Sequence, residues 1–437
     1  MDVSLITILM FAALTILLLS GLPLAFVMGS LAVLFNILLL GPQSLAMITS
    51  VVYGVMDNFI FIAIPLFVFM GMVLQRSGIA EDAYDMMYKW IGGVKGGLAM
   101  GTVAVCTIFA ALTGISAAAT VSMGIIALPS MLKRGYDKKI AMGAISAGGT
   151  LGILIPPSVL MIVYGVFASE SIGRLFAGGI VPGLLLSLLF IIYIAVRSYL
   201  QPQLCPSIPP GERPAWRERF VSLRGLILPI LLIVMVLGAI FWGICTPTEA
   251  AAVGSLGSLL CAAIRRSLTW TVLKESCYQT LALSSMLLWI IIGSSAFCSL
   301  YTAVGAIEFV RELIAALPVS PTIVMAGIMF ILFILGMFLD PGGIIMITTP
   351  IFVPVIKMLG FDPVWFGVVF IIMMQIGYLT PPFGFNIFYM KSIVPRDITM
   401  QDICLAMVPF VLIMLTFVML LAAFPNIVLW LPNLLFK

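Results

Sequence analysis

Twelve apolar runs, separated by short polar or charged stretches, make up most of the chain. A membrane-spanning helix needs about 20 residues, with a range of about 17–25, and all twelve runs lie within that range or exceed it. The first six cover residues 4–20, 23–40, 58–75, 97–132, 140–168 and 173–199, and the second six cover 223–243, 248–264, 278–300, 321–357, 362–391 and 403–431. The sequence therefore predicts an all-α polytopic membrane protein.

Composition supports a lipid environment and excludes several kinds of chemistry. Of the 437 residues, 63% are hydrophobic and 9% are charged, whereas a soluble domain is about half apolar and about a quarter charged. The chain has no histidine, which removes Ser-His and Cys-His nucleophile pairs and His-ligated zinc or haem. Its seven cysteines form no C-x-x-C pair, so we interpret them as small apolar side chains. No charge run indicates nucleic acid, and the first apolar run lacks the basic start of a signal peptide.

The two halves of the chain are related by an internal duplication. A shift of 225 residues takes Ala25 to Ala250, Gly29 to Gly254, Pro129 to Pro354, Gly135 to Gly360, Asp137 to Asp362, Pro156-Pro157 to Pro381-Pro382, and Tyr164 to Tyr389. One nearly constant offset over most of each half is not expected by chance. A proline-rich, charged stretch separates the halves and is typical of a linker. We expect a first repeat at residues 1–200, a cytoplasmic linker at 201–222 and a second repeat at 223–437.

Each repeat contains two interrupted runs. The runs 97–132 and 321–357 are too long for one span and carry a turn signal in the middle, Thr113-Gly114-Ile115-Ser116 and Leu339-Asp340-Pro341-Gly342-Gly343. We predict that both are re-entrant helical hairpins. The following runs, 140–168 and 362–391, contain glycines and a Pro-Pro pair, and proline interrupts helical hydrogen bonding. A proline kink in an ordinary span is the alternative, but the equivalent positions in both repeats favour broken helices.

The distribution of basic residues tests this arrangement. When the hairpins are counted as re-entrant, each repeat has five spans, and the odd number inserts the second repeat upside down. Of the 21 Lys and Arg residues, only Arg174, Arg311, Lys357 and Lys437 then fall on one side, and the other seventeen share the opposite side. Cytoplasmic loops carry the excess of Lys and Arg. The sequence therefore predicts inverted repeats with both termini periplasmic and the two hairpin tips approaching near mid-membrane.

The hairpin tips and helix breaks are the candidate binding sites, because non-helical backbone at membrane depth lines a cavity or is buried in protein. Half-helices that begin there leave unpaired N–H groups and a positive dipole end that points at the cavity, and inverted repeats with such discontinuous helices are the architecture of secondary transporters. The residues expected to contact substrate are Ser116, Ala117, Pro157, Ser158, Gly342, Gly343 and Pro382. Unwound carbonyls and hydroxyls are hard oxygen ligands, and the candidate sodium ligands are Thr113, Gly114, Ser116, Gly148, Thr150, Asp340, Gly377 and Thr380.

Other roles remain open for some of these residues. Asp340 is an ion ligand, a helix N-cap or a proton carrier, and the first two roles are compatible. Glu249 is interpreted mainly as a helix cap. Gly148 and Gly149 have a structural alternative, because small residues permit the close packing of membrane helices. Hydroxyls of membrane helices often bond their own i−4 carbonyl, which we expect mainly for residues outside the candidate set. Because the chain has no histidine and few buried acids, sodium coupling is favoured over proton coupling.

Several motifs together resemble a known family. Gly114 to Val121, Gly149 to Ser158, Thr246-Pro247-Thr248-Glu249-Ala250-Ala251-Ala252 and Tyr378 to Pro382 are similar to the large, DctM-like membrane subunit of tripartite ATP-independent periplasmic (TRAP) transporters, and the resemblance covers nearly the whole chain. It implies an elevator-type sodium symporter of the bacterial inner membrane that imports organic acids such as C4-dicarboxylates or sialic acid. Its implied partners are a separate, small four-helix membrane subunit and a soluble periplasmic substrate-binding protein; sodium ions are the implied coupling ions, without an organic cofactor.

Three other functions fit the sequence less well. A self-sufficient sodium–dicarboxylate symporter of related fold carries Ser-Asn-Thr motifs at its tips, whereas the tips here are Gly-Ile-Ser and Asp-Pro-Gly-Gly. A membrane-embedded enzyme is disfavoured by the missing histidine. A passive channel does not need two hairpins that open from opposite sides.

Overall fold

The computed structural model describes residues 2–316 and 318–436, and within them every regular element is a helix, as the sequence predicts. Nine of the described helices are long and apolar enough to cross a membrane. The chain is thus a multi-pass membrane protein, and the prediction of an all-α polytopic fold is confirmed. Lys437, one of the four basic residues assigned to the sparse side, lies outside the described residues.

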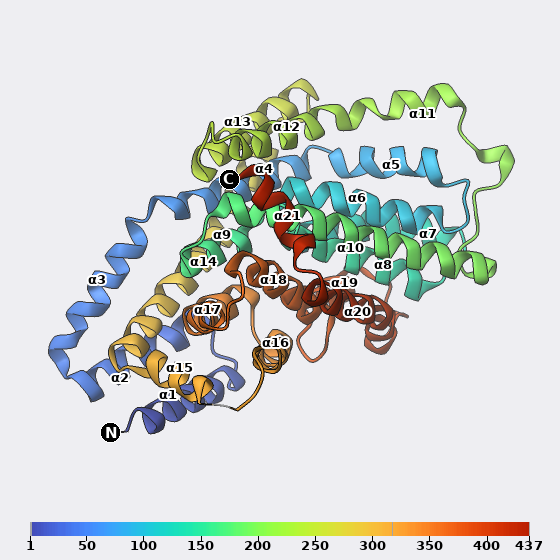
Figure 1. The fold of residues 1–437 in the computed structure, drawn as a ribbon. Helices are drawn as coiled ribbons and strands as arrows, with labels where there is room; N and C mark the ends of the chain where they lie inside the picture. The colour runs from blue at the N-terminus through green and yellow to red at the C-terminus, as the bar shows by residue number, and fades with distance from the viewer. Residues whose placement is uncertain (1, 317, 437) are drawn as a thin grey trace.

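The first repeat contains ten α-helices (Figure 1). They are α1 Val3–Leu19, α2 Leu24–Leu40, α3 Leu45–Met56, α4 Ala63–Arg76, α5 Ile79–Ile91, α6 Gly97–Thr113, α7 Ser116–Lys133, α8 Lys138–Thr150, α9 Val159–Ala168 and α10 Ile172–Leu200. The expected hairpin is the pair α6 and α7, and the expected broken helix is α8 followed by α9.

The second repeat follows the same order. Its helices are α12 Arg224–Phe241, α13 Pro247–Ile264, α14 Trp270–Ala303, α15 Ala306–Ala315, α16 Pro321–Phe338, α17 Pro341–Met358, α18 Pro363–Leu379, α19 Phe385–Ile393 and α20 Met400–Ala423, and α21 Asn426–Leu435 ends the chain. The helices α7 and α17 begin and end 225 residues apart, and so do the first residues of α8 and α18. The offset seen in the sequence is therefore also an offset between equivalent helices.

The helix boundaries differ from the expected runs at three places. Residues 45–56 form the helix α3, which the apolar runs did not include, whereas the equivalent residues of the second repeat continue without a break in α14. The run 403–431 is divided at Pro425, which separates α20 from α21. The end of the expected linker is helical, since α11 Trp216–Ser222 leads directly into α12.

The helices pack in two groups. In the first, α4 packs on α13 and α14, α2 packs on α14, and α12 packs on α13. In the second, α8 packs on α6, α7 and α20, and α18 packs on α16 and α20. The amphipathic helices α5 and α15 join α4 to α6 and α14 to α16 along the chain. The second group thus contains the first hairpin and the first half of each broken helix, while α17 packs both on α9 and on α14 of the first group.

The pairing between the repeats is reciprocal. Helix α7 of the first repeat packs on α19 of the second, and α17 of the second packs on α9 of the first. Because α7 corresponds to α17 and α19 corresponds to α9, the two contacts are equivalent, as expected for a pseudo-two-fold relation between the repeats. Both hairpins therefore face the broken helix of the other repeat.

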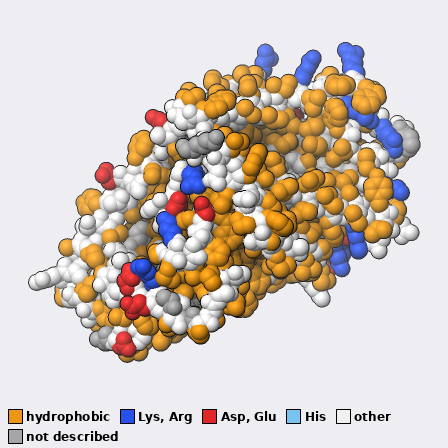
Figure 2. Space-filling view, viewed as in Figure 1, with side chains coloured by type: hydrophobic (Ala, Val, Ile, Leu, Met, Phe, Trp, Pro, Cys, Tyr) orange, Lys and Arg blue, Asp and Glu red, His pale blue; other side chains and the backbone are white. Residues whose placement is uncertain are grey.

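Charge is unevenly placed on the surface. Figure 2 shows many Lys and Arg side chains along the upper edge and the right-hand end of this face, where Figure 1 places α5, α7 and α11. The acidic side chains visible here lie toward the left, with a few basic side chains among them. Orange hydrophobic side chains cover most of the area between them. The broad apolar surface fits a protein surrounded by lipid.

Candidate functional site

The tip of the first hairpin is a two-residue turn between α6 and α7. Gly114 caps α6 with φ 64°, a left-handed conformation that favours glycine. Ile115 is extended, and Ser116 begins α7. An added Cβ at Gly114 would also collide with the carbonyl oxygen of Pro157. The turn therefore requires glycine both for its backbone angle and for its contact with the neighbouring break.

The first broken helix lies directly against this tip. The helix α8 ends at Thr150, a short 3₁₀ turn follows at Leu151–Ile153, and α9 starts at Val159. The Ser158 hydroxyl donates to the Ile153 carbonyl at 2.6 Å and accepts from Met161 N at 3.4 Å, which caps α9. A Cβ on Gly152 would lie 3.0 Å from the Ile115 carbonyl carbon. Tip and break thus form one compact unit.

Two side chains of the second repeat reach into this unit. Ser116 Oγ donates to Asn386 Oδ1 at 2.9 Å, and Asn386 Nδ2 donates to the Ser146 carbonyl at 3.0 Å. Gln375 Nε2 donates to the Thr150 carbonyl at 3.0 Å. Sequence reasoning missed both amides, although a lone Gln within the apolar run 362–391 was a usable signal, because polar side chains inside membrane helices are rare.

The second hairpin tip is capped by an acid. Asp340 precedes α17, and its Oδ2 accepts from Gly342 N at 2.9 Å, with Pro341 at the first helical position. The prediction that Asp340 is an N-cap is confirmed, and its role as an ion ligand stays a prediction. Gly343 lies against Leu24 of α2, and a Cβ there would overlap that side chain. The tip therefore touches the other group of helices.

The second break lies against its own hairpin, as the first does. The helix α18 ends at Leu379, and Gly377 faces Gly336 near the end of α16, where an added Cβ would lie 2.5 Å from the Gly336 carbonyl oxygen. Phe383 N, after the Pro381-Pro382 pair, donates to the Met337 carbonyl at 3.2 Å. Pro382 is exposed, whereas the equivalent Pro157 is buried. The two breaks therefore share a geometry but differ in exposure.

Three of the expected ligand hydroxyls bond their own helix. Thr113 donates to the Phe109 carbonyl at 2.9 Å, Thr150 to the Ala147 carbonyl at 2.7 Å, and Thr380 to the Ile376 carbonyl at 2.7 Å. Back-bonding of this kind is expected for most hydroxyls outside the candidate set, where it is confirmed for residues such as Thr102, Thr280 and Thr348, and it extends to these three candidates as well. A hydroxyl that donates this way keeps its acceptor lone pairs, so a role of these oxygens as ligands stays a prediction.

The close-packing interpretation of the two glycines in α8 is supported. A Cβ on Gly148 would lie 2.9 Å from Cys106 Cβ of α6, and one on Gly149 would overlap the Thr120 hydroxyl of α7. Ala117, also an expected substrate contact, is half-buried on α7. Whether the Gly148 carbonyl also binds sodium stays a prediction.

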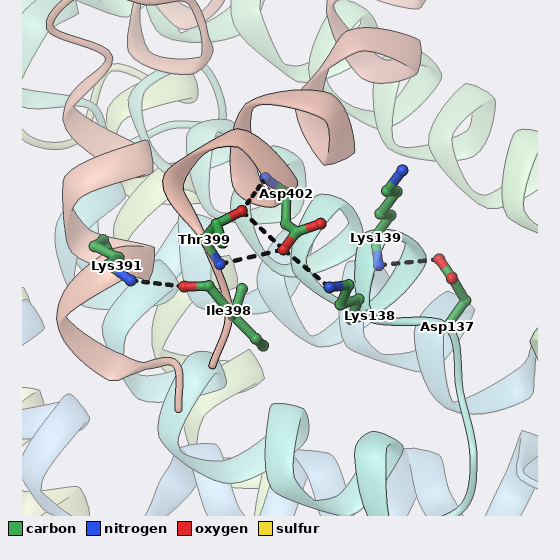
Figure 3. A network of polar contacts seen from close by, with 7 residues as sticks. All are labelled: Asp137, Lys138, Lys139, Lys391, Ile398, Thr399 and Asp402. Carbon is green, nitrogen blue, oxygen red and sulfur yellow. Dashed lines mark hydrogen bonds and ion pairs between the residues drawn. The ribbon is translucent and has the colours of Figure 1, made fainter. Parts of the chain in front are cut away.

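Two polar networks outside the tips fix helix ends. Glu249 and Thr246 form a capping box at the start of α13, with Glu249 Oε2 accepting from Thr246 N at 2.8 Å, so its assignment as a cap is confirmed. Figure 3 shows a second capping box, Thr399 with Asp402, at the start of α20. Lys138 at the start of α8 pairs with Asp402 at 2.9 Å. This ion pair ties the broken helix α8 to α20.

Comparison with known proteins agrees with this architecture. The family model described as "Tripartite ATP-independent periplasmic transporter, DctM component" matches residues 11–427. The chain is 33% identical over 359 residues to the C4-dicarboxylate TRAP transporter large permease protein DctM of Pseudomonas aeruginosa, covering 82% of this chain and 83% of that protein. It is 32% identical over 351 residues to the ectoine TRAP transporter large permease protein TeaC of Halomonas elongata, covering 80% and 81%.

A solved structure supports the fold alone. The YdaH transporter of Alcanivorax borkumensis, described as having an unusual topology, aligns with a TM-score of 0.66 at 14% identity and covers 95% of this chain and 98% of that one. The family match extends over nearly the whole chain and includes both hairpins and both broken helices. The protein is therefore a transport protein rather than an enzyme, and it belongs to the DctM family of TRAP transporter large permease subunits.

Proposed function

We propose that this subunit imports an organic acid into the cell, driven by a sodium gradient through an elevator movement. The observation that carries the proposal is the pairing of each hairpin tip with a helix break. In such a movement the hairpins and broken helices would slide as a body against α1–α4 and α12–α14, with α5 and α15 as connecting arms. Secondary transporters commonly form their binding sites from discontinuous helices near the membrane midplane, and one group of helices moves against the other.

Sodium is the coupling ion that the donor set favours. The oxygen atoms at the first tip and break are carbonyls and hydroxyls of Thr113, Gly114, Ser116, Gly148 and Thr150, none of which is ionisable. Such oxygens suit a hard cation, and they offer no group to carry a proton. At the second tip and break, the candidate ligands are Asp340, Gly377 and Thr380.

The helix N-termini at the same tips and breaks carry a partial positive charge, which suits the carboxylate of an organic acid. The helices α7, α9, α17 and α19 begin at the tips and breaks, so their unpaired N–H groups favour a carboxylate. The expected contacts are Ser116, Ala117, Pro157 and Ser158 in the first repeat and Gly342, Gly343 and Pro382 in the second. Relatives named for C4-dicarboxylate and for ectoine are almost equally similar to this chain, so identity does not select among substrates. We propose a C4-dicarboxylate, sialic acid or a similar carboxylate.

The assembly follows from the family. We propose that the subunit works in the bacterial inner membrane with a small four-helix membrane subunit and a soluble periplasmic binding protein. Both termini would be periplasmic, with residues 1–200 and 223–437 as inverted repeats joined by a cytoplasmic linker at 201–222. The gathering of basic side chains at one end of the molecule supports this orientation.

Reconstitution tests the proposal directly. The chain is placed in liposomes alone, with the small membrane subunit, and with that subunit plus the binding protein. Uptake of a labelled C4-dicarboxylate and of labelled sialic acid is measured under an inward sodium gradient, and again with choline replacing sodium. We expect uptake only for the complete set and only with sodium. Uptake by the lone chain would favour a self-sufficient symporter, and uptake that is indifferent to sodium would refute the coupling.

A further inference from the structure

One buried side chain connects three interruptions of the backbone. Asn386 is the second residue of α19, directly after the second break. Its Oδ1 accepts from Ser116, the first residue of α7 at the first hairpin tip, and its Nδ2 donates to the Ser146 carbonyl, one turn before α8 ends. The side chain of Asn386 is fully buried. A single amide therefore links the first tip, the first break and the second break.

A second amide makes a similar connection. Gln375 of α18 donates to the Thr150 carbonyl at 3.0 Å, and Thr150 is the last residue of α8. The two residues are 225 positions apart, so they occupy equivalent places in the two repeats. Their contact therefore lies where the pseudo-two-fold relation brings equivalent residues together.

These contacts are not a general means of joining the repeats. The reciprocal positions of Asn386 and Ser116, 225 residues away, are Met161 and Pro341. Neither can reproduce the amide–hydroxyl hydrogen bond, although α9 and α17 pack as closely related partners. The duplication therefore accounts for the packing of both helix pairs. Of the two, only the contact between α7 and α19 at the first tip contains a buried amide.

The amides are also costly to bury. Gln375 is fully buried and its Oε1 has no hydrogen-bond partner among the described residues, as is the case for the hydroxyls of Ser146 and Thr120. An unsatisfied buried polar group costs about 1–3 kcal/mol, and replacing both partners of a hydrogen bond by apolar groups of the same shape can be nearly neutral or stabilising. Packing alone therefore does not account for two amides at this interface.

We propose that Asn386 and Gln375 are positioning residues through which the second repeat sets the geometry of the first tip and break. The proposal rests on the sodium-coupled function above. Asn386 fixes where Ser116 and the carbonyl of Ser146 lie, and Gln375 orients the Thr150 carbonyl. Because Asn386 follows the second break, a shift of that break moves the oxygen atoms of the first. Ion binding in one repeat is thereby linked to the conformation of the other.

Sodium-dependent thermal stabilisation of the purified full-length chain tests this linkage. Melting temperature is measured in detergent while sodium chloride replaces choline chloride at constant ionic strength, which gives the half-saturating sodium concentration. We expect Asn386→Ala to raise that concentration about 3- to 10-fold, as the loss of one hydrogen bond of ordinary strength from the sodium-bound state would. Gln375→Leu, similar in size, should raise it about threefold. Asn386→Asp keeps the acceptor for Ser116 and should fall between the wild type and Asn386→Ala.

Met161→Ala is the matched control. Met161 is buried at the equivalent position of the first repeat, so this variant should lower the melting temperature while leaving the half-saturating sodium concentration within twofold of wild type. An equal shift in Met161→Ala would show that packing alone is responsible and would overturn the proposal. So would unchanged sodium affinity in both Asn386→Ala and Gln375→Leu; if Asn386→Ala does not fold, Gln375→Leu and Asn386→Asp decide. A wild-type chain that sodium does not stabilise would instead refute the sodium coupling itself.

Discussion

Gly377→Ala tests the contact between the second hairpin and the second break. A Cβ at this position would lie 2.5 Å from the Gly336 carbonyl oxygen, 2.7 Å from its carbonyl carbon and 2.9 Å from its Cα. All three atoms are backbone, so no side-chain rotation relieves the overlap. Ordinary contact begins near 3.4 Å, so α16 and α18 must separate by about 0.9 Å. Overpacking of this kind costs about 1–3 kcal/mol.

The cost appears in two measurements. For domains of 150–250 residues a loss of 1 kcal/mol lowers the melting temperature by about 2–4 °C, so we expect a decrease of roughly 2–12 °C in detergent. Transport in liposomes should fall with it, because the displaced segment precedes the Pro381-Pro382 break. The matched control is Gly327→Ala on α16, where no atom of the described residues lies within 4 Å of the added Cβ. Alanine is a better helix former than glycine, so the control should be neutral or slightly stabilised. A Gly377→Ala protein with wild-type melting temperature and transport would refute the close approach of the two helices.

Three further substitutions separate structural from functional roles. Asp340→Asn keeps an oxygen that caps α17 and removes the charge, so sodium or substrate dependence should weaken while the melting temperature stays near wild type; unchanged affinity for both would remove Asp340 from the site. Thr246→Ala breaks the capping box of α13 and should cost about 1 kcal/mol in thermal stability without changing substrate affinity, and a stable variant would contradict the cap. Lys138→Met removes the ion pair with Asp402, in which the Lys138 side chain is 42% exposed and the Asp402 side chain 20%. We expect a loss of folding stability of less than about 1 kcal/mol, which shrinks in high salt. A large, salt-independent loss of stability would show that the pair is effectively buried.

Much of the site's backbone was predictable, because its signals are local or repeated. The over-long runs 97–132 and 321–357 each contain a turn motif, and the structure divides each of them there into two helices. The Pro-Pro pairs mark the two breaks, since proline removes a donor wherever it stands. A signal that occurs twice at one offset does not depend on tertiary context, which is why these elements could be found without a structure.

The contacts between the repeats could not be predicted in the same way. Ser116 and Asn386 are 270 residues apart, and Asn386 and Ser146 are 240 apart. No pattern in one helix indicates which partner lies across the interface. The helix α3 was missed for a different reason, because its 12 residues are too few for a span and include polar ones. Its end at Met56 has no counterpart in the continuous α14, so the duplication gave no help there.

The two repeats share a backbone but not a chemistry, and the difference has an electrostatic consequence. The candidate ligands of the first tip and break are all neutral, whereas the second tip carries Asp340. A sodium ion held by neutral oxygens leaves a full positive charge uncompensated where the dielectric constant is low, next to the N-terminal N–H groups of α7 and α9. A cation beside Asp340 is largely neutralised by its carboxylate. The first site is therefore the one whose occupancy would most strongly attract a carboxylate substrate, so coupling between cation and anion is expected to depend more on Ser116 and Thr150 than on Asp340.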